Sequence, residues 1–582
     1  MTNELDLTRR LRCFALAAGL TLAGLATPAL AQDAPPPPSS GVSYAAPDAQ
    51  AADGQAPDSD DGQQEESARG ESRPGRRGGT RGSIRPYLEV SQTVSADLDG
   101  GETLTYTSLS AGVDGTIRTR RVTAQASYRY ERNIEWEGNV ADRDVHSGIA
   151  TVNAQIIPGT LSFDAGAMAT RTGGDGRALG VTNRDAAVNV YSAVAGPSLS
   201  ARAGPLAVNA SYRLGYVKID DDRVAGTLSD DFDESVAHSA TASVGMGPGG
   251  ALPFGWTVGA GYAREDSGGR YDNRFEGAYV RADVVIPVSA TLAVTAGVGY
   301  ENIQSSERDI VRDGNGDPVL DAQGRPIPDP DAPRVLGYDM DGFMYDAGII
   351  WRPGPRTELQ ARAGRRYGGT TVVGTLGHRF NEDYAVNVAV VDSVETLGRI
   401  ITNDLTNLPD GIDVNRDPIT GDIGGCVFGQ QGGGVCLGQA LQSITSRTFR
   451  MRGANIVFSG SRRLWNFGLG ASYVNRRYSR PSNQFVSVVG AGEDQSFNLF
   501  GSIGRQLSRS SNVDLSLYAS WYDNDLADFR SITSLGGTVS YNRSFVLDRL
   551  RLIAAMGLYN NDDGFESSTN ASGLLGLRYT FW

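Results

Sequence analysis

The sequence predicts an all-β protein, a transmembrane antiparallel β-barrel of about 22 strands, within a range of roughly 18 to 24. Three observations lead to this fold class. Long segments alternate apolar and polar residues with a period of two, as strands with one apolar face do. The connections between these segments alternate between short and long. The chain also ends in an alternating stretch with aromatic residues, LLGLRYTFW.

The alternation recurs from Arg85 onward. Every second residue is apolar in 122–130, 206–216, 292–300 and 513–521, and again in 550–558. Strands of globular proteins usually have about five or six residues, whereas tilted strands that cross hydrocarbon need about 9–11. Several apolar faces end in Tyr or Trp, as expected at a membrane interface.

The lengths of the connections support a barrel over other β architectures. The short links are 118–121, 158–159, 201–205, 352–355, 381–383 and 508–511. The longer links are 135–144, 173–185, 220–233, about 305–338, about 396–445 and 479–494, and 367–369 is an exception. Outer-membrane barrels have short periplasmic turns and long extracellular loops. A β-sandwich would not sort its loops in this way, and a solenoid would repeat at a fixed period that this sequence lacks.

The ends of the sequence differ from the barrel in composition. Residues 1–31 combine three arginines, a short apolar run and the sequence Ala29-Leu30-Ala31, which predicts a secretory signal peptide. Residues 32–83 are Pro-rich, then acidic, then rich in Arg and Gly, and predict a disordered linker. The barrel is predicted for residues 84–582, in a Gram-negative outer membrane, with both termini periplasmic. Its expected surroundings are outer-membrane lipid and lipopolysaccharide.

Composition excludes some classes of function. The formal net charge is -14, which disfavours nucleic acid as a partner. No apolar stretch approaches the ~18 residues of a spanning helix, and the mean hydropathy is -0.28. The sequence predicts no cofactor and leaves the oligomeric state open.

The C-terminal stretch resembles the terminal signal of outer-membrane barrels, which the barrel-assembly machinery recognises. The residues that carry this resemblance are Leu575, Leu577, Tyr579, Phe581 and Trp582. Tyr579 and Phe581 match the register of that signal one residue inward, and Trp582 is additional. The resemblance implies the barrel-assembly machinery as a partner.

Few residues indicate chemistry. Cys426 and Cys436 lie in the longest loop, on the predicted cell exterior, and an even number of cysteines in an oxidising compartment predicts a disulfide. Asp313 begins a stretch like a calcium loop, but position twelve is Gly324 instead of glutamate, so an acidic turn is expected and no metal site is predicted. The three histidines, His146, His238 and His378, are scattered outside any nucleophile or protease motif, so the sequence predicts no enzyme.

The predicted lumen face carries charges of both signs among many small polar residues. These residues are Arg129, Glu131, Arg213, Arg281, Asp283, Glu301, Arg362, Arg366, Asp514 and Arg551. Such residues tune selectivity in a water-filled barrel. Mixed charge suits hydrated polar solutes, including sugars, but the same charges can pair and simply hold the wall, so both interpretations stay open.

The start of the barrel, from RPYLEVSQTVSADLDGGETLTYT to the Tyr-rich strand ASYRYERN, resembles a family of outer-membrane barrels associated with exopolysaccharide export and PEP-CTERM sorting genes. The resemblance extends over about residues 85–300. It implies a role in surface-polysaccharide export or envelope organisation, with polysaccharide as a partner and no functional residues to transfer.

Two functions therefore remain. The first is a channel or export barrel for hydrated polar solutes or surface polysaccharide. The second is a non-conducting structural or adhesive barrel with long extracellular loops. A TonB-dependent receptor is disfavoured, because such receptors carry a folded plug before the barrel. The 396–445 loop bears on the choice, because a long loop can fold inward and plug a pore.

Overall fold

A computed structural model describes most of the chain from Arg81 onward. The described residues are 81–137, 143–173, 187–220, 232–249, 252–269, 272–321, 327–381, 383–408, 412–413, 416–423, 426–429, 434–436, 444–479, 492–525, 530–546 and 549–581. The predicted signal peptide and almost all of the predicted linker lie outside these residues. β1 begins at Arg81, shortly before the predicted barrel start at residue 84.

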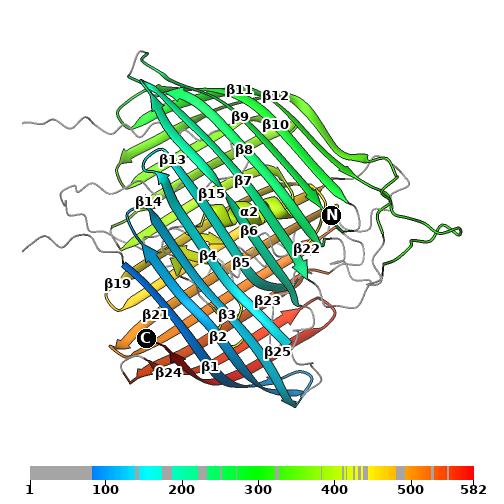
Figure 1. The fold of residues 1–582 in the computed structure, drawn as a ribbon, viewed down its shortest axis with the longest axis vertical. Helices are drawn as coiled ribbons and strands as arrows, with labels where there is room; N and C mark the ends of the chain where they lie inside the picture. Colours follow the sequence, from blue (N-terminus) through cyan, green and yellow to red (C-terminus); the bar gives the residue numbers. More distant parts are fainter. Residues whose placement is uncertain are drawn as a thin grey trace, which may run out of the picture. The chain divides into compact units, whose positions relative to one another are not determined.

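Twenty-two strands form one antiparallel sheet. They are β1 (Arg81–Asp97), β2 (Thr103–Arg118), β3 (Val122–Glu137), β4 (Arg143–Ile157), β5 (Leu161–Gly173), β6 (Ala187–Ala203), β7 (Leu206–Asp220), β8 (Glu234–Met246), β9 (Gly255–Ser267), β10 (Asn273–Pro287), β11 (Leu292–Glu307), β12 (Val335–Gly354), β13 (Thr357–Arg366), β14 (Gly369–Arg379), β15 (Tyr384–Glu395), β19 (Phe449–Arg462), β20 (Trp465–Tyr478), β21 (Glu493–Ser508), β22 (Ser511–Asn524), β23 (Ile532–Phe545), β24 (Leu550–Asp562) and β25 (Ser567–Thr580). Each strand pairs with its neighbour along the chain (Figure 1).

The sheet closes because its first and last strands pair. β1 runs antiparallel to β25 from Tyr87 opposite Thr580 to Asp97 opposite Asn570. Closure leaves the described 22-stranded sheet without an edge strand, which a bilayer requires because unpaired backbone groups in hydrocarbon cost several kcal/mol each. The predicted antiparallel barrel of about 22 strands is therefore confirmed.

The two faces of the sheet differ as the alternation predicts. On β1, Leu88 and Val90 are about half exposed on the outside, whereas the intervening Glu89 and the following Ser91 are buried on the inside. The outer face is therefore apolar and suited to lipid, while the inner face is polar and suited to water.

Short and long connections lie at opposite ends of the barrel. Strands that meet at one end, called the turn end here, are joined by residues 119–121, 158–160, 204–205, 247–254, 288–291, 355–356, 380–383, 463–464, 509–510 and 546–549. Strands that meet at the other, the loop end, are joined by residues 98–102, 138–142, 174–186, 221–233, 268–272, 308–334, 367–368, 396–448, 479–492, 525–531 and 563–566. The start of β1 and the end of β25 both lie at the turn end.

The longest connection, between β15 and β19, has secondary structure of its own. It contains helix α2 (Leu397–Thr406) and a small sheet of β16 (Ile412–Asp413), β17 (Cys426–Gly429) and β18 (Gly434–Cys436). Among the described residues, no helix has the length and apolar character needed to cross a membrane.

Candidate functional site in the barrel lumen

All ten charged residues that were predicted for the lumen lie on the inner face of the barrel. One group of them converges on strands β10, β12 and β13. The Arg281 guanidinium contacts the Asp283 carboxylate at 2.7 Å and the Asp346 carboxylate at 2.6 Å, and Arg362 contacts Asp283 at 2.6 Å. We call these four residues the wall network. Because both signs are matched inside it, the network stabilises the wall without any contribution from the loop.

A second group joins β1, β3 and β25. The Arg129 guanidinium lies between the carboxylates of Glu89, at 3.0 Å, and Glu131, at 2.6 Å. Arg578 contacts Glu89 at 2.7 Å. This group spans the strand pair that closes the barrel, so it also helps to hold the closure.

The remaining predicted charges lie apart from these groups. Arg366 pairs with Glu301 at 2.7 Å, and Arg213 pairs with Asp164 at 2.7 Å. Asp514 and Arg551 line a lumen cavity at the turn end of the barrel.

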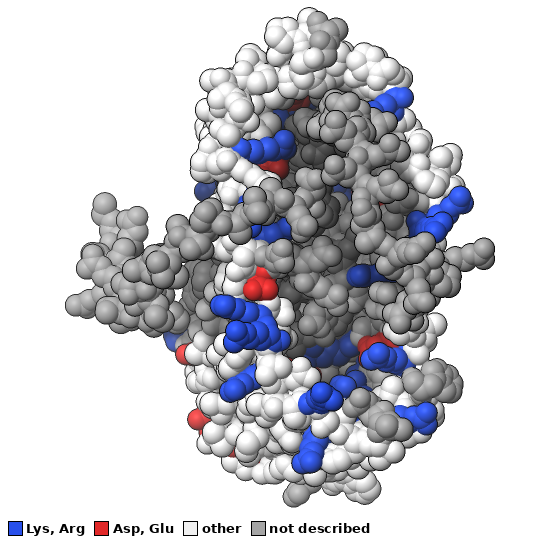
Figure 2. Space-filling model, turned by 90° about the vertical axis from the view of Figure 1, so that its left-hand side faces the viewer, with Lys and Arg blue, Asp and Glu red and all other residues white. Residues whose placement is uncertain are grey.

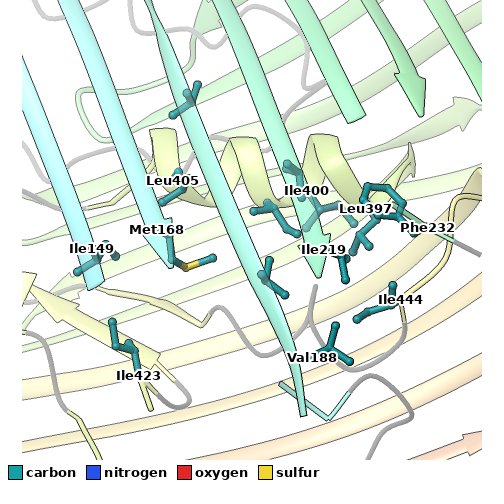
Figure 3. Packing of buried hydrophobic residues seen from close by; sticks show 14 of the residues in the cluster. Ile149, Met168, Val188, Ile219, Phe232, Leu397, Ile400, Leu405, Ile423 and Ile444 are labelled. Carbon is teal, nitrogen blue, oxygen red and sulfur yellow. The ribbon is translucent and has the colours of Figure 1, made fainter. Parts of the chain in front are cut away.

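Helix α2 lies inside the barrel, against the inner faces of β5 to β9. Its apolar residues recur at helical spacing, as in an amphipathic helix. They are buried against wall residues such as Met168, Val188 and Ile219 (Figure 3). The helix residues in this cluster are Leu397, Ile400, Ile401 and Leu405. The sequence allowed the 396–445 loop to fold inward, and α2 does so where the wall offers apolar side chains for the helix to cover.

The first turn of α2 is fixed to the wall by polar contacts. Thr396, the N-cap residue, makes no side-chain cap and instead donates its hydroxyl to the buried Glu265 carboxylate at 2.5 Å. Arg399 pairs with Glu395 at 3.2 Å, and its guanidinium lies 4.4 Å from the Phe275 ring centre.

Farther along the loop, residues 416–423 attach to two separated parts of the wall. Arg171 on β5 forms a bidentate pair with the Asp422 carboxylate, at 2.8 and 3.0 Å. On the other side, Thr538 on β23 and Tyr559 on β24 donate their hydroxyls to Asp417, at 2.6 and 3.0 Å. The segment therefore reaches across the inside of the wall from β5 to β23.

Arg416 adds an anchor on β3 and β4. Its guanidinium donates to the hydroxyls and carbonyl oxygens of Ser127 and Ser147, at 2.7 to 3.2 Å. Burial lowers the pKa of Arg416, and the nearby Tyr87 opposes that shift. We call α2 and residues 416–423 together the docked loop.

Below the docked loop, toward the turn end, the lumen opens into two adjoining cavities. One, of about 860 Å³, reaches up to Arg416, Asp417 and Pro418. The other, of about 950 Å³, lies at the mouth of the barrel, and we call it the arginine vestibule. Its arginines are Arg85, Arg463, Arg505, Arg509, Arg549, Arg551 and Arg578, and its carboxylates are Asp114 and Asp514. Figure 2, which views the molecule from this end, shows arginine side chains gathered over the face with a few acidic ones among them.

Cys426 and Cys436 are directly opposite each other in the β17–β18 pair. Directly opposed residues in an antiparallel pair have a Cα separation of about 4.5–5.5 Å, which a disulfide can bridge. Their side chains lie outside the described part of the structure, so the disulfide stays a prediction.

The histidines and the calcium-like loop have local partners. On the outer face, His146 and His238 contact the hydroxyls of Tyr128 and Tyr212, at 2.7 and 2.8 Å. His378 contacts the Thr357 hydroxyl at 2.7 Å. The Asp313 carboxylate accepts the backbone N–H groups of residues 315 and 317, which makes the stretch an acidic turn. Among the described residues, no group of His, Cys, Asp and Glu side chains is arranged to hold a metal ion.

The predicted assembly signal forms the outer face of β25. Leu575, Leu577 and Tyr579 are exposed on the outside, and the Tyr579 and Phe581 rings lie 5.2 Å apart. The Phe581 backbone N–H donates to the Pro86 carbonyl at 2.9 Å. Trp582 lies outside the described residues. Recognition by the assembly machinery stays a prediction.

Sequence reasoning missed the residues that dock the loop. The sequence does not single out Arg171, Arg416, Asp417 or Asp422, and only the structure places them at the contacts between loop and wall. One signal was available, because Leu397, Ile400, Ile401 and Leu405 have helical spacing inside what was read as a loop.

Comparison with known proteins adds little beyond the fold. No family model and no curated protein matches the sequence. Among solved structures, the ferric-catecholate import receptor Fiu of E. coli is 9% identical, with 85% of this chain and 82% of that chain covered and a TM-score of 0.41. The FrpB iron transporter of Neisseria meningitidis (F5-1 variant) is 10% identical, with 85% and 82% covered and a TM-score of 0.40. The siderophore receptor PiuA of Acinetobacter baumannii gives the same four values, 10%, 85%, 82% and 0.40. Similarities at this level concern the fold of outer-membrane barrels and carry no argument about function.

Proposed function

We propose that this protein is a gated outer-membrane channel and that the docked loop is its gate. In this proposal the turn end faces the periplasm, and hydrated polar solutes, surface polysaccharide among them, pass through the lumen when the loop moves. The observation that carries the proposal is the docking of α2 and residues 416–423 on the inner wall from β23 to β9, above a polar cavity of about 860 Å³.

The contacts that hold the docked loop support the proposal that the loop can move. The docked loop is held by an apolar cluster on one side and by a few discrete polar contacts, at Arg416, Asp417 and Asp422, on the other. Each polar contact contributes only a few kcal/mol once exchanged for contacts with water, since a net hydrogen bond contributes about 0.5–1.5 kcal/mol and one to a charged group about 1.5–3 kcal/mol. A segment attached in this way can leave the wall without breaking the barrel, whose strands pair with one another independently of it.

The resemblance of residues 85–300 to barrels of exopolysaccharide export supports polysaccharide as the passenger. A water-filled wall of Ser, Thr, Asn and paired charges suits a hydroxyl-rich chain. The orientation is supported by the asymmetry of connections, since outer-membrane barrels place short turns in the periplasm.

The test is single-channel conductance in planar bilayers. β15 and β19 pair up to Glu395 opposite Phe449, so a short Gly-Ser linker can replace residues 397–447 and keep the wall intact. The wild type should show small or infrequent openings, and the linker variant should show large, stepwise ones. A matched control shortens the other long connection, 308–334, which should leave conductance unchanged. If both the wild type and the linker variant stay closed while folded, the channel is wrong and the structural barrel is favoured.

A further inference from the structure

The arginine vestibule is lined mainly by positive charge, although the protein as a whole is acidic. The whole chain has a formal net charge of -14, whereas seven arginines and two aspartates line this cavity of about 950 Å³. A cavity with walls of low dielectric constant and one sign of charge focuses the field and concentrates counter-ions. The vestibule therefore attracts anions to the mouth of the lumen.

Two of the vestibule arginines face each other on neighbouring strands. Arg551 on β24 is directly opposite Arg578 on β25, and both side chains are on the inner face. Like charges directly opposite each other destabilise an antiparallel pair. Arg578 pairs with Glu89, and Arg129 pairs with both Glu89 and Glu131, so this group holds two carboxylates for two guanidinium groups. The excess positive charge of the vestibule therefore comes from the turn arginines.

The turn arginines add charge that the protein does not neutralise. Within the part of the chain that the structure describes, Arg463, Arg509 and Arg549 form no ion pair, although all three line the vestibule. They come from three separate turns, 463–464, 509–510 and 546–549, which the barrel brings to one side of its mouth. Guanidinium groups spread around a rim can contact several acidic groups along one chain-like ligand.

The neutral lining indicates the nature of that ligand. Between the arginines lie amide and hydroxyl side chains, including Asn466, Gln506, Asn512 and Ser544. These groups donate and accept hydrogen bonds in the way that hydroxyl-rich solutes require. Guanidinium forks bind carboxylate and phosphate in bidentate geometry. Together the two kinds of group match an acidic sugar chain better than an acyl chain or an inorganic ion.

We propose that the arginine vestibule binds an acidic oligosaccharide, whose carboxylate groups contact the arginines and whose hydroxyls contact the amide and hydroxyl lining. This inference deepens the proposed channel function, on which it rests, by naming the class of solute that the turn end admits. The vestibule lies directly below the cavity that ends at the docked loop, and the two cavities share Arg85, Arg551 and Arg578. A ligand bound there would lie directly below the docked loop.

The test is calorimetric binding to the full-length protein in neutral detergent. The probes are a short oligogalacturonate and an uncharged malto-oligosaccharide of equal length. The oligogalacturonate should bind, with an affinity that falls as salt is raised, and the malto-oligosaccharide should bind at least about tenfold more weakly. Equal binding of the two, or binding of neither, would overturn the inference.

Variants then locate the site. The double variant Arg509→Gln and Arg549→Gln changes only turn residues, so the strand ladder stays intact, and it should lower oligogalacturonate affinity about tenfold or more. Arg477→Gln is the control, because Arg477 lies at the loop end with its side chain 67% exposed and paired with Glu493. Retained heat-modifiable gel migration shows that each variant is folded. Unchanged affinity in the folded double variant would place the ligand elsewhere.

Conductance separates this inference from the channel itself. If the Gly-Ser linker variant conducts but shows no preference for anions and no block by oligogalacturonate, the vestibule inference fails and the channel stands. If no variant conducts but oligogalacturonate still binds and the double variant loses it, the channel fails and the binding site stands.

Discussion

Two arcs of the inner wall carry buried charge in different ways. On β10 to β13, the wall network pairs its arginines and aspartates with one another. On β3 to β5 and β23 to β24, wall residues such as Arg171 and Tyr559 find their partners on the docked loop. The first arc is complete without the loop, whereas the second is complete only when the loop is docked. Damage to the first should weaken the barrel, and damage to the second should release the gate.

The largest effect is expected from the centre of the wall network. Arg281→Met leaves the Asp283 and Asp346 carboxylates buried with Arg362 as their remaining cation. Breaking a buried charge pair by removing one partner costs about 3–5 kcal/mol, so the free energy of unfolding should fall by that amount. Urea unfolding in detergent, followed by heat-modifiable gel migration, measures it.

The matched control for that variant is Arg477→Gln at the loop end. Its pair with Glu493 is exposed, and exposed pairs contribute about 0–1 kcal/mol. If Arg281→Met and Arg477→Gln unfold at the same urea concentration, the wall network does not stabilise the barrel.

The next effect is expected on the loop-dependent arc. Asp422→Asn removes the charge that faces the Arg171 guanidinium, with both residues buried. Docking of the loop should weaken by about 2–4 kcal/mol, since an unpaired buried charge remains on the wall. The variant should open more often in planar bilayers, while its urea midpoint stays near that of the wild type. A variant that unfolds early without extra openings would contradict the division into two arcs.

This comparison also shows what sequence alone could predict. The strands could be predicted because each residue in a barrel wall faces either lipid or water. Neighbouring residues such as Leu88 and Glu89 therefore alternate between apolar and polar, and this pattern is visible in the sequence. The partners of the docked loop could not, because they lie far away along the chain. Arg171 and Asp422, for instance, are 251 residues apart along the chain and meet because the loop turns inward.

The arginine vestibule could not be predicted from the sequence for a similar reason. Its arginines stand in or beside short turns, where a polar residue is expected at a membrane interface and carries no special meaning. Arg85 near the start of the barrel and Arg578 near its end come together only through the closure of the sheet. Convergence of charge from several turns is a property of the closed barrel and not of any one segment.

A third effect concerns the fit of α2 against the wall. Gly215 on β7 faces Thr402 so closely that an added Cβ would lie 2.3 Å from the Thr402 hydroxyl. Gly215→Val should therefore push the helix away and weaken docking by about 1–3 kcal/mol, the usual range for overpacking. Limited proteolysis of the loop in intact barrels reports the change as faster cleavage.

Two further variants sharpen this result. Gly573→Val on β25 is the control, because an added Cβ there would have no atom within 4 Å, and cleavage should stay at the wild-type rate. Adding Thr402→Ala to Gly215→Val removes the two nearest atoms, the Oγ1 and Cγ2 of Thr402, and should slow the cleavage again. Fast cleavage in all three variants would show that valine harms the strands themselves and not the fit of the helix.

The smallest effect is a dependence of the gate on pH. Burial raises the pKa of Asp404 on α2 to about 8, and the nearby Glu395 carboxylate adds to the rise. The docked state therefore holds a proton that the released state gives up near the ordinary value of 3.8. Since the docked state binds more protons between these two values, docking is strongest at low pH and weakens as pH rises toward about 8, above which it levels off. The slope is at most about 1.4 kcal/mol per pH unit.

Open probability in planar bilayers should accordingly increase from pH 6 to pH 7.5, and Asp404→Asn should remove that increase because it cannot ionise. The Arg399–Glu395 pair faces the same region, so Arg399→Gln serves to separate the two causes. Loss of Arg399 removes the cation that pairs with Glu395 and should leave the increase with pH in place, whereas loss of Asp404 should remove it. If open probability still increases with pH in the Asp404→Asn variant, another group titrates. The pH dependence would then not distinguish the loop-dependent arc from the wall network.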